Sequence, residues 1–285
     1  MIEPVRSGQE LLAEMAEPVP ANHLALWWLG QSGYALRHGD HVIYIDLYLS
    51  DHLTKKYAGT EKPHIRMTKA PLQASDLTNA TLVFSTHRHS DHLDPETLPE
   101  VLRVSPRCRA VLPRAIMGYA SGLGLPEDRL IPVNAGDRLE FGSLAVTAVP
   151  SAHEDLDLTS DGLYPYLGYV LRLGSITVYH PGDTVLYPGL IEMLQPHAVD
   201  IALLPINGRD ARRRALGTPG NLTPQEAAQL SVAIGARIVI PHHYDMFTFN
   251  TGDPKELVRL VMTGRLPIKV QVLRCGERWL YVALG

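Results

Sequence analysis

The sequence predicts an α/β fold in which two β-sheets pack face to face and helices cover the outer face of each sheet. Two observations lead to this four-layer αββα sandwich. Short runs of β-branched and apolar residues recur along the whole chain of 285 residues, and segments with helix-start signals separate some of them. Many of the runs are apolar throughout, which favours sheets that are buried on both faces.

The predicted strands are short, as is usual in globular proteins. The first follows an acidic, proline-flanked N-terminal stretch, and the last ends close to the C-terminus. They comprise residues 24–28, 41–45, 82–84, 144–149, 169–173, 176–179, 201–204, 237–240, 269–273 and 279–282.

Helix-start signals mark three of the segments between strands. In Thr223-Pro224-Gln225-Glu226 a capping Thr precedes a Pro at the first helical position, and a Glu follows three residues after the cap. Gly235 lies directly after the last apolar residue of this segment and is placed to end the helix. Two further helices are predicted to begin by the same logic, at Asp253-Pro254-Lys255-Glu256 and at Asp94-Pro95-Glu96-Thr97.

The domain organisation is predicted to be simple. No linker rich in Pro, Gly or Ser divides the chain, so we expect residues 21–285 to form one domain and residues 1–20 to add an N-terminal arm or helix. Cys108 and Cys275 are the only cysteines. Two cysteines form neither a disulfide framework nor a thiolate metal cluster, so we expect two reduced thiols.

Composition excludes several classes of function. Hydrophobic residues make up 45% and charged residues 20% of the chain, and the net charge of −4 provides no overall attraction to nucleic acid or to anionic membranes. The N-terminus lacks the basic and apolar regions of a signal peptide, and no apolar run approaches the ~20 residues of a membrane span. We therefore expect a cytoplasmic protein that acts on a small molecule, with homo-oligomer formation left open.

The strongest functional signal is the segment His87-Arg88-His89-Ser90-Asp91-His92, directly after the predicted strand at residues 82–84. It places three imidazoles and one carboxylate within six residues. These groups offer the nitrogen and oxygen ligands that divalent first-row metals prefer. A strand that ends where the ligands begin can hold them at a rigid sheet edge, so the segment predicts a metal site.

Further candidate ligands follow later predicted strands. His153 comes shortly after residues 144–149, and Asp183 follows residues 176–179 within a turn in which Gly182 allows close backbone approach. His242 and His243 both follow residues 237–240. Adjacent side chains in an extended segment point in opposite directions, so one of these two histidines is predicted to bind metal and the other to pack.

These residues resemble the metallo-β-lactamase-fold hydrolase superfamily, whose hallmark is the H-x-H-x-D-H loop followed by a His, a bridging Asp and a terminal His. The resemblance covers essentially the whole chain and implies the metallo-β-lactamase fold. It also implies two divalent metal ions, for which zinc, manganese and iron all remain open. One ion would be held by His87, His89 and His153, the other by Asp91, His92 and His243, with Asp183 bridging the two.

A closer resemblance is to the branch that contains the L-ascorbate-6-phosphate lactonases. Its residues are Trp27-Trp28-Leu29-Gly30, Asp91-His92-Leu93-Asp94-Pro95, Asn207-Gly208-Arg209 and Ile238-Val239-Ile240-Pro241-His242-His243. Aligning the last segment on Pro241 places the metal-binding histidine at His243. The expected reaction is hydrolysis of a small, optionally phosphorylated sugar lactone by a metal-activated water, with Asp91 as the proton acceptor.

Substrate contacts are predicted from the neighbourhood of these segments. Asn207 and Arg209 match the lactonase branch, and Arg209 begins a basic cluster that continues at residues 212–214. Because guanidinium groups bind phosphate well, Arg209 is predicted to recognise an anionic group on the substrate; a solvated basic loop is the alternative. Tyr244 is a candidate hydrogen-bond donor to an oxyanion, with packing as the alternative.

Three other functions remain to be weighed against a lactonase. A phosphodiesterase on the same fold is the main alternative, although the negative net charge disfavours a nuclease. An oxygen-reducing di-iron protein of this fold would need an acidic ligand near His89 and a flavin domain, and the sequence has neither. A scaffold without catalytic activity is disfavoured by the complete set of ligands.

Overall fold

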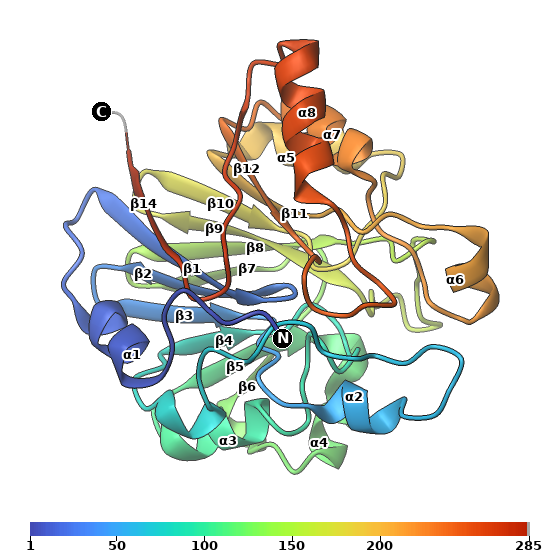
Figure 1. Ribbon diagram of the computed structural model, residues 1–285. Coiled ribbons are helices and arrows are strands. Elements are labelled where there is room, and N and C mark those ends of the chain that lie inside the picture. Colours follow the sequence, from blue (N-terminus) through green and yellow to red (C-terminus); the bar gives the residue numbers. More distant parts are fainter. Residues whose placement is uncertain (284–285) are drawn as a thin grey trace.

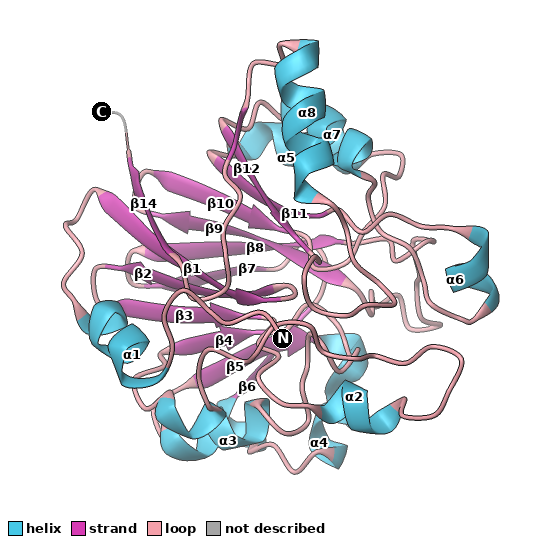
Figure 2. Cartoon of the chain, viewed as in Figure 1, coloured by secondary structure: helices cyan, strands magenta, loops and turns pink. Residues whose placement is uncertain are grey.

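A computed structural model describes residues 1–283. Two seven-stranded sheets lie face to face, and helices cover the outer face of each (Figures 1 and 2). This arrangement confirms the predicted four-layer αββα sandwich. The largest apolar cluster lies between the sheets and under the helices of the second one, and it includes Trp28, Phe84, Tyr169 and Tyr179.

The first sheet is built mainly from the N-terminal half of the chain. Its strands are β1 (His23–Gly30), β2 (Gly33–His38), β3 (His41–Ile45), β4 (Leu82–Phe84), β5 (Arg109–Pro113), β6 (Leu130–Val133) and β14 (Arg278–Val282). Their spatial order is β14-β1-β2-β3-β4-β5-β6. The strands from β3 to β6 run parallel to one another, whereas β1 pairs antiparallel with both β2 and β14.

The second sheet takes its strands from residue 138 onward. They are β7 (Arg138–Phe141), β8 (Leu144–Pro150), β9 (Leu167–Leu173), β10 (Ile176–His180), β11 (Ile201–Pro205), β12 (Ile238–His242) and β13 (Lys269–Val270). Their order is β13-β12-β11-β10-β9-β8-β7. The strands β10, β11 and β12 run parallel, and β8 points the same way because both β8 and β10 pair antiparallel with β9.

Each sheet has its own helical cover. Helices α1 (Gly8–Ala16), α3 (Leu98–Val104) and α4 (Met117–Gly122) share a second apolar cluster with the outer face of the first sheet. On the second sheet lie α5 (Leu190–Leu194), α7 (Pro224–Ala233) and α8 (Pro254–Gly264). Two short helices, α2 (His52–Lys56) and α6 (Ala211–Ala215), lie in loops, and single 3₁₀ turns span Ala74–Asp76, Arg114–Ile116, Glu127–Arg129 and Gln195–His197.

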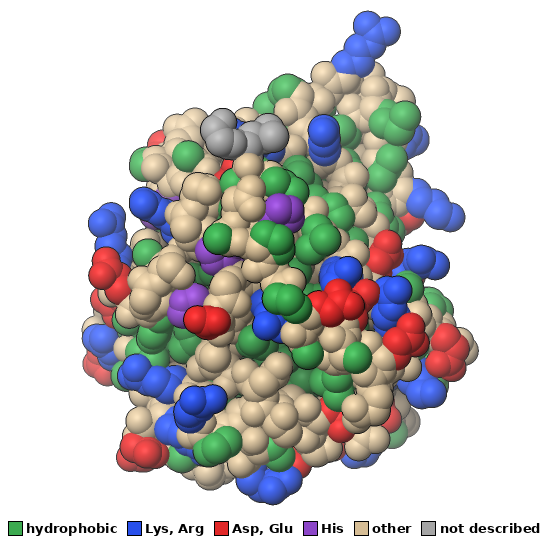
Figure 3. All heavy atoms as spheres, turned by 90° about the vertical axis from the view of Figure 1, so that its left-hand side faces the viewer, with side chains coloured by type: hydrophobic (Ala, Val, Ile, Leu, Met, Phe, Trp, Pro, Cys, Tyr) green, Lys and Arg blue, Asp and Glu red, His purple; other side chains and the backbone are tan. Residues whose placement is uncertain are grey.

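Helix α1 lies within the predicted N-terminal segment and buries Leu11 and Met15 against the first sheet. The core between the sheets draws on strands from the rest of the chain, and we propose on this basis that residues 21–285 form one domain. Within residues 1–283, no helix has the length and hydrophobicity that a membrane span needs. The face in Figure 3 carries acidic and basic side chains interspersed, so it presents no field of a single sign.

Element boundaries depart from the sequence predictions at a few places. Helix α3 begins at Leu98 and not near Asp94, because the Asp94 carboxylate accepts hydrogen bonds from the Ser50 hydroxyl at 2.8 Å and from the Glu96 amide at 2.9 Å, in a turn before the helix. Strand β13 ends three residues earlier than predicted. Four strands were not predicted, β2, β5, β6 and β7, since charged residues or proline interrupt their apolar pattern.

Candidate metal centre

The histidine-rich segment forms a tight loop at the carboxyl end of β4. The amides of His92 and Leu93 both bond to the carbonyl of His89, which turns the loop back on itself. His87 and His92 are buried, and their ring centroids lie 4.0 Å apart. The loop therefore presents its imidazoles inward, as the sequence predicted for ligands held at a sheet edge.

Three other predicted ligands approach this loop from the second sheet. His153 follows β8, Asp183 follows β10 and His243 follows β12, and these three strands all point in one direction. Their carboxyl ends consequently meet at one edge of the sheet, opposite the end of β4. The site is thus assembled from loops of both sheets.

The seven predicted ligands fall into two triads and one carboxylate between them. The ligand atoms of His87, His89 and His153 lie within 4.8 Å of one another, and so do those of Asp91, His92 and His243. Asp183 faces both triads. Its Oδ2 lies 3.4 Å from His153 Nε2, and its Oδ1 lies 3.1 Å from His243 Nε2. A carboxylate with one oxygen toward each triad has the geometry of a bridge between two cations.

The chemistry of the cluster fits divalent cations. His92 Nε2 and Asp183 Oδ1 are buried and have no hydrogen-bond partner among the described residues, although they lie 3.4 Å apart. Burial opposes ionisation of Asp183, but the neighbouring His243 and His92 outweigh it and lower its pKa well below the usual value. Burial also lowers the pKa of His89 to about 4, so this imidazole is neutral and able to ligate.

Local backbone geometry makes the approach of these loops feasible. Gly182 has a φ of 66°, and a Cβ there would collide with the side chain of Thr86. This agrees with the expectation that Gly182 permits close approach. His243 also has a positive φ of 66°, directly after β12 ends at His242.

The two adjacent histidines occupy different environments, as predicted. His243 reaches the cluster, whereas His242 packs beneath it, stacked on His180 with ring centroids 5.1 Å apart. The Nδ1 of His242 lies 3.1 Å from the hydroxyl of Ser32. Burial lowers the pKa of His242 well below its usual value, so it is neutral.

Two buried side chains next to the cluster were missed in the sequence. Asp46 accepts a hydrogen bond from His92 Nδ1 at 2.7 Å and two more from Thr86, which leaves Nε2 of His92 facing Asp183. Gln31 donates from Nε2 to Asp91 Oδ2 at 2.8 Å. Gln31 directly follows β1 and Asp46 directly follows β3. A position just after a strand is the same signal that selected the candidate ligands.

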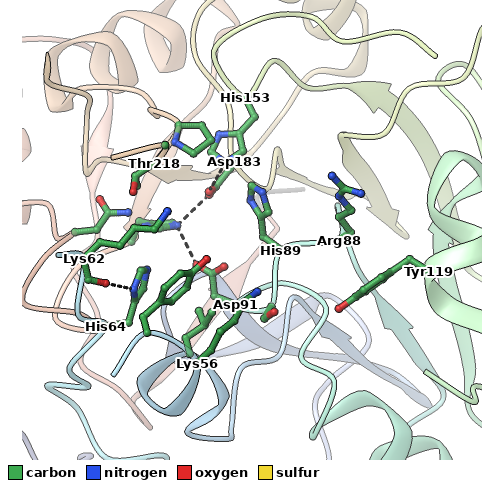
Figure 4. Close-up of a pocket in the computed structure, with 17 residues that line it drawn as sticks. Lys56, Lys62, His64, Arg88, His89, Asp91, Tyr119, His153, Asp183 and Thr218 are labelled. Atoms are coloured by element: carbon green, nitrogen blue, oxygen red, sulfur yellow. Dashed lines mark hydrogen bonds and ion pairs between the residues drawn. The ribbon is translucent and has the colours of Figure 1, made fainter. Parts of the chain in front are cut away.

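The cluster forms the floor of a pocket with a volume of about 350 Å³. Figure 4 shows Lys56, Lys62 and His64 on one side of Asp91, with Arg88 and Tyr119 on the other. The wall thus contains three basic side chains beside the acidic and imidazole groups of the floor. None of these basic residues was predicted as a substrate contact: Lys56 and Lys62 lie far from the matching segments in sequence, whereas Arg88 lies within the histidine-rich segment itself.

The predicted substrate contacts need correction. Arg209 lies outside the pocket lining, and its guanidinium donates to both carboxylate oxygens of Glu226 at 2.7 Å, so its charge is already paired. The side chain of Asn207 is bonded to Asn250 and Asn221. These two residues organise the loop and do not face the pocket.

Tyr244 also lies away from the pocket. It is 2% exposed, stacks on Trp28 with ring centroids 4.3 Å apart and donates its hydroxyl to the carbonyl of Leu273. Two other arginines of the basic cluster are similarly engaged: Arg213 donates to the carbonyl of Asn207 at 2.8 Å, and Arg214 donates to Glu154 Oε1 at 3.1 Å. The ring of Tyr244 is therefore packed and its hydroxyl is occupied, so Tyr244 is not placed to donate to an oxyanion as predicted.

Comparisons with known proteins agree with this architecture. Residues 37–244 match the family model described as beta-lactamase superfamily domain. A metal-dependent hydrolase from Hyperthermus butylicus is 30% identical over 88% of this chain and 96% of its own length. A probable L-ascorbate-6-phosphate lactonase from Escherichia coli is 24% identical over 85% of this chain and 75% of its own length.

Among solved structures, a metallo hydrolase from the archaeon Ignicoccus hospitalis superposes with a TM-score of 0.67. The match covers 92% of this chain and 100% of that one at 22% identity, and it supports the fold. The family match spans most of the sheets, and six of the seven residues of the cluster lie well inside it, from the β4 loop to the turn after β10, with His243 near its end. The chain therefore belongs to the beta-lactamase superfamily, among its metal-dependent hydrolases.

Proposed function

We propose that this protein is a dinuclear metal-dependent hydrolase of the lactonase type, acting on a small sugar lactone. One observation carries the proposal: Asp183 lies at the pocket floor with one oxygen toward each triad of candidate ligands. His87, His89 and His153 would hold one ion, and Asp91, His92 and His243 the other. Two divalent cations would supply Lewis acidity and lower the pKa of a water toward ~7.

The residues around the floor have separable roles in this reaction. Asp91 lines the pocket, so its carboxylate can accept the proton that the attacking water loses. Gln31 holds Oδ2 of Asp91, which orients the carboxylate. Asp46 holds the His92 ring with Nε2 toward the cluster. Most of these groups are buried, so few other water molecules can compete for them.

The choice of substrate class rests on similarity and on the pocket wall. The Escherichia coli relative is named as a probable lactonase, and the match extends over most of both chains. A phosphodiesterase is the second candidate, because the basic side chains of the wall suit any anionic substrate. Both reactions would use a water activated by ions held at the two candidate triads, so the bond that is cleaved distinguishes them.

An activity screen tests the proposal directly. The full chain, loaded separately with zinc, manganese or iron, would be assayed against sugar lactones, their 6-phosphates and bis(p-nitrophenyl) phosphate. We expect lactone hydrolysis that disappears in Asp183→Asn. Hydrolysis of the phosphodiester alone would favour the second candidate. No turnover of any substrate by protein shown to contain two metal ions would contradict the proposed function.

A further inference from the structure

A chain of buried asparagine side chains ends at the wall of the pocket. Asn221 donates from Nδ2 to Oδ1 of Asn207 at 3.0 Å, and Asn207 donates from Nδ2 to Oδ1 of Asn250 at 2.8 Å. Asn250 is 8% exposed and lines the pocket that holds the candidate metal cluster, whereas Asn207 and Asn221 do not line it. The three amides therefore pass hydrogen bonds in one direction, toward the pocket.

Arg213 fixes the direction of this chain. Its Nη1 also donates to Oδ1 of Asn250, and because a guanidinium group has no acceptor, the amide atom that faces it must be the oxygen. Arg213 donates further from Nη2 to the carbonyl of Asn207 at 2.8 Å and from Nε to the carboxylate of Asp210. Since three acceptors surround the guanidinium group, its position is well defined.

The other end of the Asn250 amide is a donor without a partner. Its Oδ1 accepts two hydrogen bonds, but Nδ2 donates to no other group among residues 1–283. The amide cannot rotate by half a turn, because Nδ2 would then face the two donors of Asn207 and Arg213. An unpaired donor in a largely buried side chain costs free energy unless a ligand or a water accepts from it. Nδ2 is therefore the polar atom that Asn250 offers to a ligand in the pocket.

The loop that carries Asn250 is anchored at the candidate metal ligand His243. The amide of Gly252 donates to the carbonyl of His243 at 3.0 Å, which closes residues 243–252 into a loop. Within this loop the amide of Asn250 donates to the carbonyl of Phe247 at 3.2 Å, and the Phe247 side chain is buried. These contacts hold Asn250 in place relative to the cluster, which reduces the entropy lost when a ligand binds.

We propose that Asn250 donates a hydrogen bond from Nδ2 to a carbonyl or hydroxyl oxygen of the substrate, and that Arg213 and Asn207 hold the donor in this orientation. The inference rests on the proposed function and adds a residue that contacts the substrate. A sugar lactone carries both kinds of oxygen next to its scissile bond. Arg213 is a positioning residue, because it acts on the substrate through Asn250, and its charge also polarises the amide that donates.

The hydroxyl groups of the same pocket fit this role less well. Tyr57 and Thr218 also line the pocket, but a hydroxyl rotates and serves as either a donor or an acceptor. The amide of Asn250 differs from them because its neighbours fix which atom is free. It can therefore discriminate in favour of an acceptor oxygen on the substrate.

Two substitutions at Asn250 test the contact in the metal-loaded full chain. Asn250→Asp keeps the shape of the side chain and an oxygen for Asn207 and Arg213, but it replaces the free donor with an acceptor. Asn250→Ala removes the donor without adding a charge. We expect both to lower kcat/KM for a sugar lactone about tenfold, the effect of one lost hydrogen bond. A loss in kcat would place the donor at the carbonyl oxygen, and a rise in KM would place it at a hydroxyl.

Combined substitutions test the positioning role of Arg213. Arg213→Met should lower kcat/KM in the wild type and cause no further loss in Asn250→Ala, because the arginine acts through the amide. Equal losses in both backgrounds would contradict this role. Asn134→Asp is the matched control, since Asn134 also holds a loop by its side chain but does not line the pocket, and it should keep the kinetics of the wild type.

Binding of D-gluconolactam separates this inference from the proposed function. The lactam keeps the carbonyl and hydroxyl oxygens of a sugar lactone and resists hydrolysis, so calorimetry reports its Kd directly. A Kd about tenfold higher in Asn250→Ala, without lactone turnover by the wild type, would contradict only the proposed function. Lactone turnover that is unchanged in both Asn250 variants would overturn only the inference. A wild type that neither binds the lactam nor hydrolyses a lactone would overturn both.

Discussion

At the residue scale, His243 owes its position to its backbone as well as to its side chain. Strand β12 ends at His242, and the positive φ of 66° at His243 turns the chain toward the cluster. Because side chains alternate along an extended strand, the sequence predicted different surroundings for the two histidines. In the structure, the turn at His243 places its Nε2 3.1 Å from Asp183 Oδ1.

Metal content distinguishes the roles proposed for these neighbours. His243→Ala should lose about one equivalent of metal, because it removes one ligand from the triad with Asp91 and His92. His242→Asn should retain the metal content of the wild type, since its ring packs on His180. Elemental analysis of the purified variants decides between these roles, and the reverse pattern would exchange them.

Gln31 offers a second test at this scale. Its amide donates to Asp91 Oδ2, and Gln31→Met keeps the length of the side chain while removing the donor. A hydrogen bond to a charged group contributes about 1.5–3 kcal/mol, so we expect kcat to fall at least tenfold with the metal content intact. A variant with normal kcat would show that Asp91 does not depend on this contact for its orientation.

At the scale of elements, the start of α7 explains the true function of Arg209. Thr223 and Glu226 form the predicted capping box, and the Glu226 carboxylate accepts hydrogen bonds from Thr223 and from Arg209. The arginine therefore joins the loop after β11 to the first turn of the helix.

Arg209→Met should accordingly affect stability more than activity. We expect the free energy of unfolding to fall by about 1 kcal/mol, because the half-buried pair with Glu226 and the support of the cap are lost. Urea unfolding of the variant and steady-state kinetics with its metal bound provide the measurement. A large loss of kcat/KM at unchanged stability would restore Arg209 to the substrate site.

These elements also show how far the sequence could be interpreted. The residues that gather in the candidate metal cluster could be selected from the sequence, because they follow apolar strands and a motif such as residues 87–92 has few other uses. The pocket wall could not be predicted, because Lys56 at the end of α2 and Lys62 in the following loop are brought to the site only by the tertiary structure. Similarly, Arg209 gave no sign in the sequence that Glu226 would neutralise it across 17 positions. Long-range pairing of charges depends on tertiary structure.

At the scale of the whole molecule, removal of metal should weaken the fold. The cluster contains the buried carboxylate of Asp183, the partly buried carboxylate of Asp91 and several buried imidazoles, and their ligation would offset the cost of that burial. We expect a chelator to lower Tm by roughly 5–10 °C, the effect of losing a ligand present well above its Kd. Differential scanning calorimetry of Asp183→Asn, which should show little further change with chelator, provides the control.

The origin of the ligands in both sheets has a consequence for how the chain is tied together. The loop after β4 belongs to the first sheet, and His153, Asp183 and His243 belong to the second. Bound ions would act as cross-links between segments as distant in sequence as His92 and His243. In polymer terms, they would restrict the unfolded chain as a disulfide does, in a protein whose two cysteines are both buried and unpaired among the described residues.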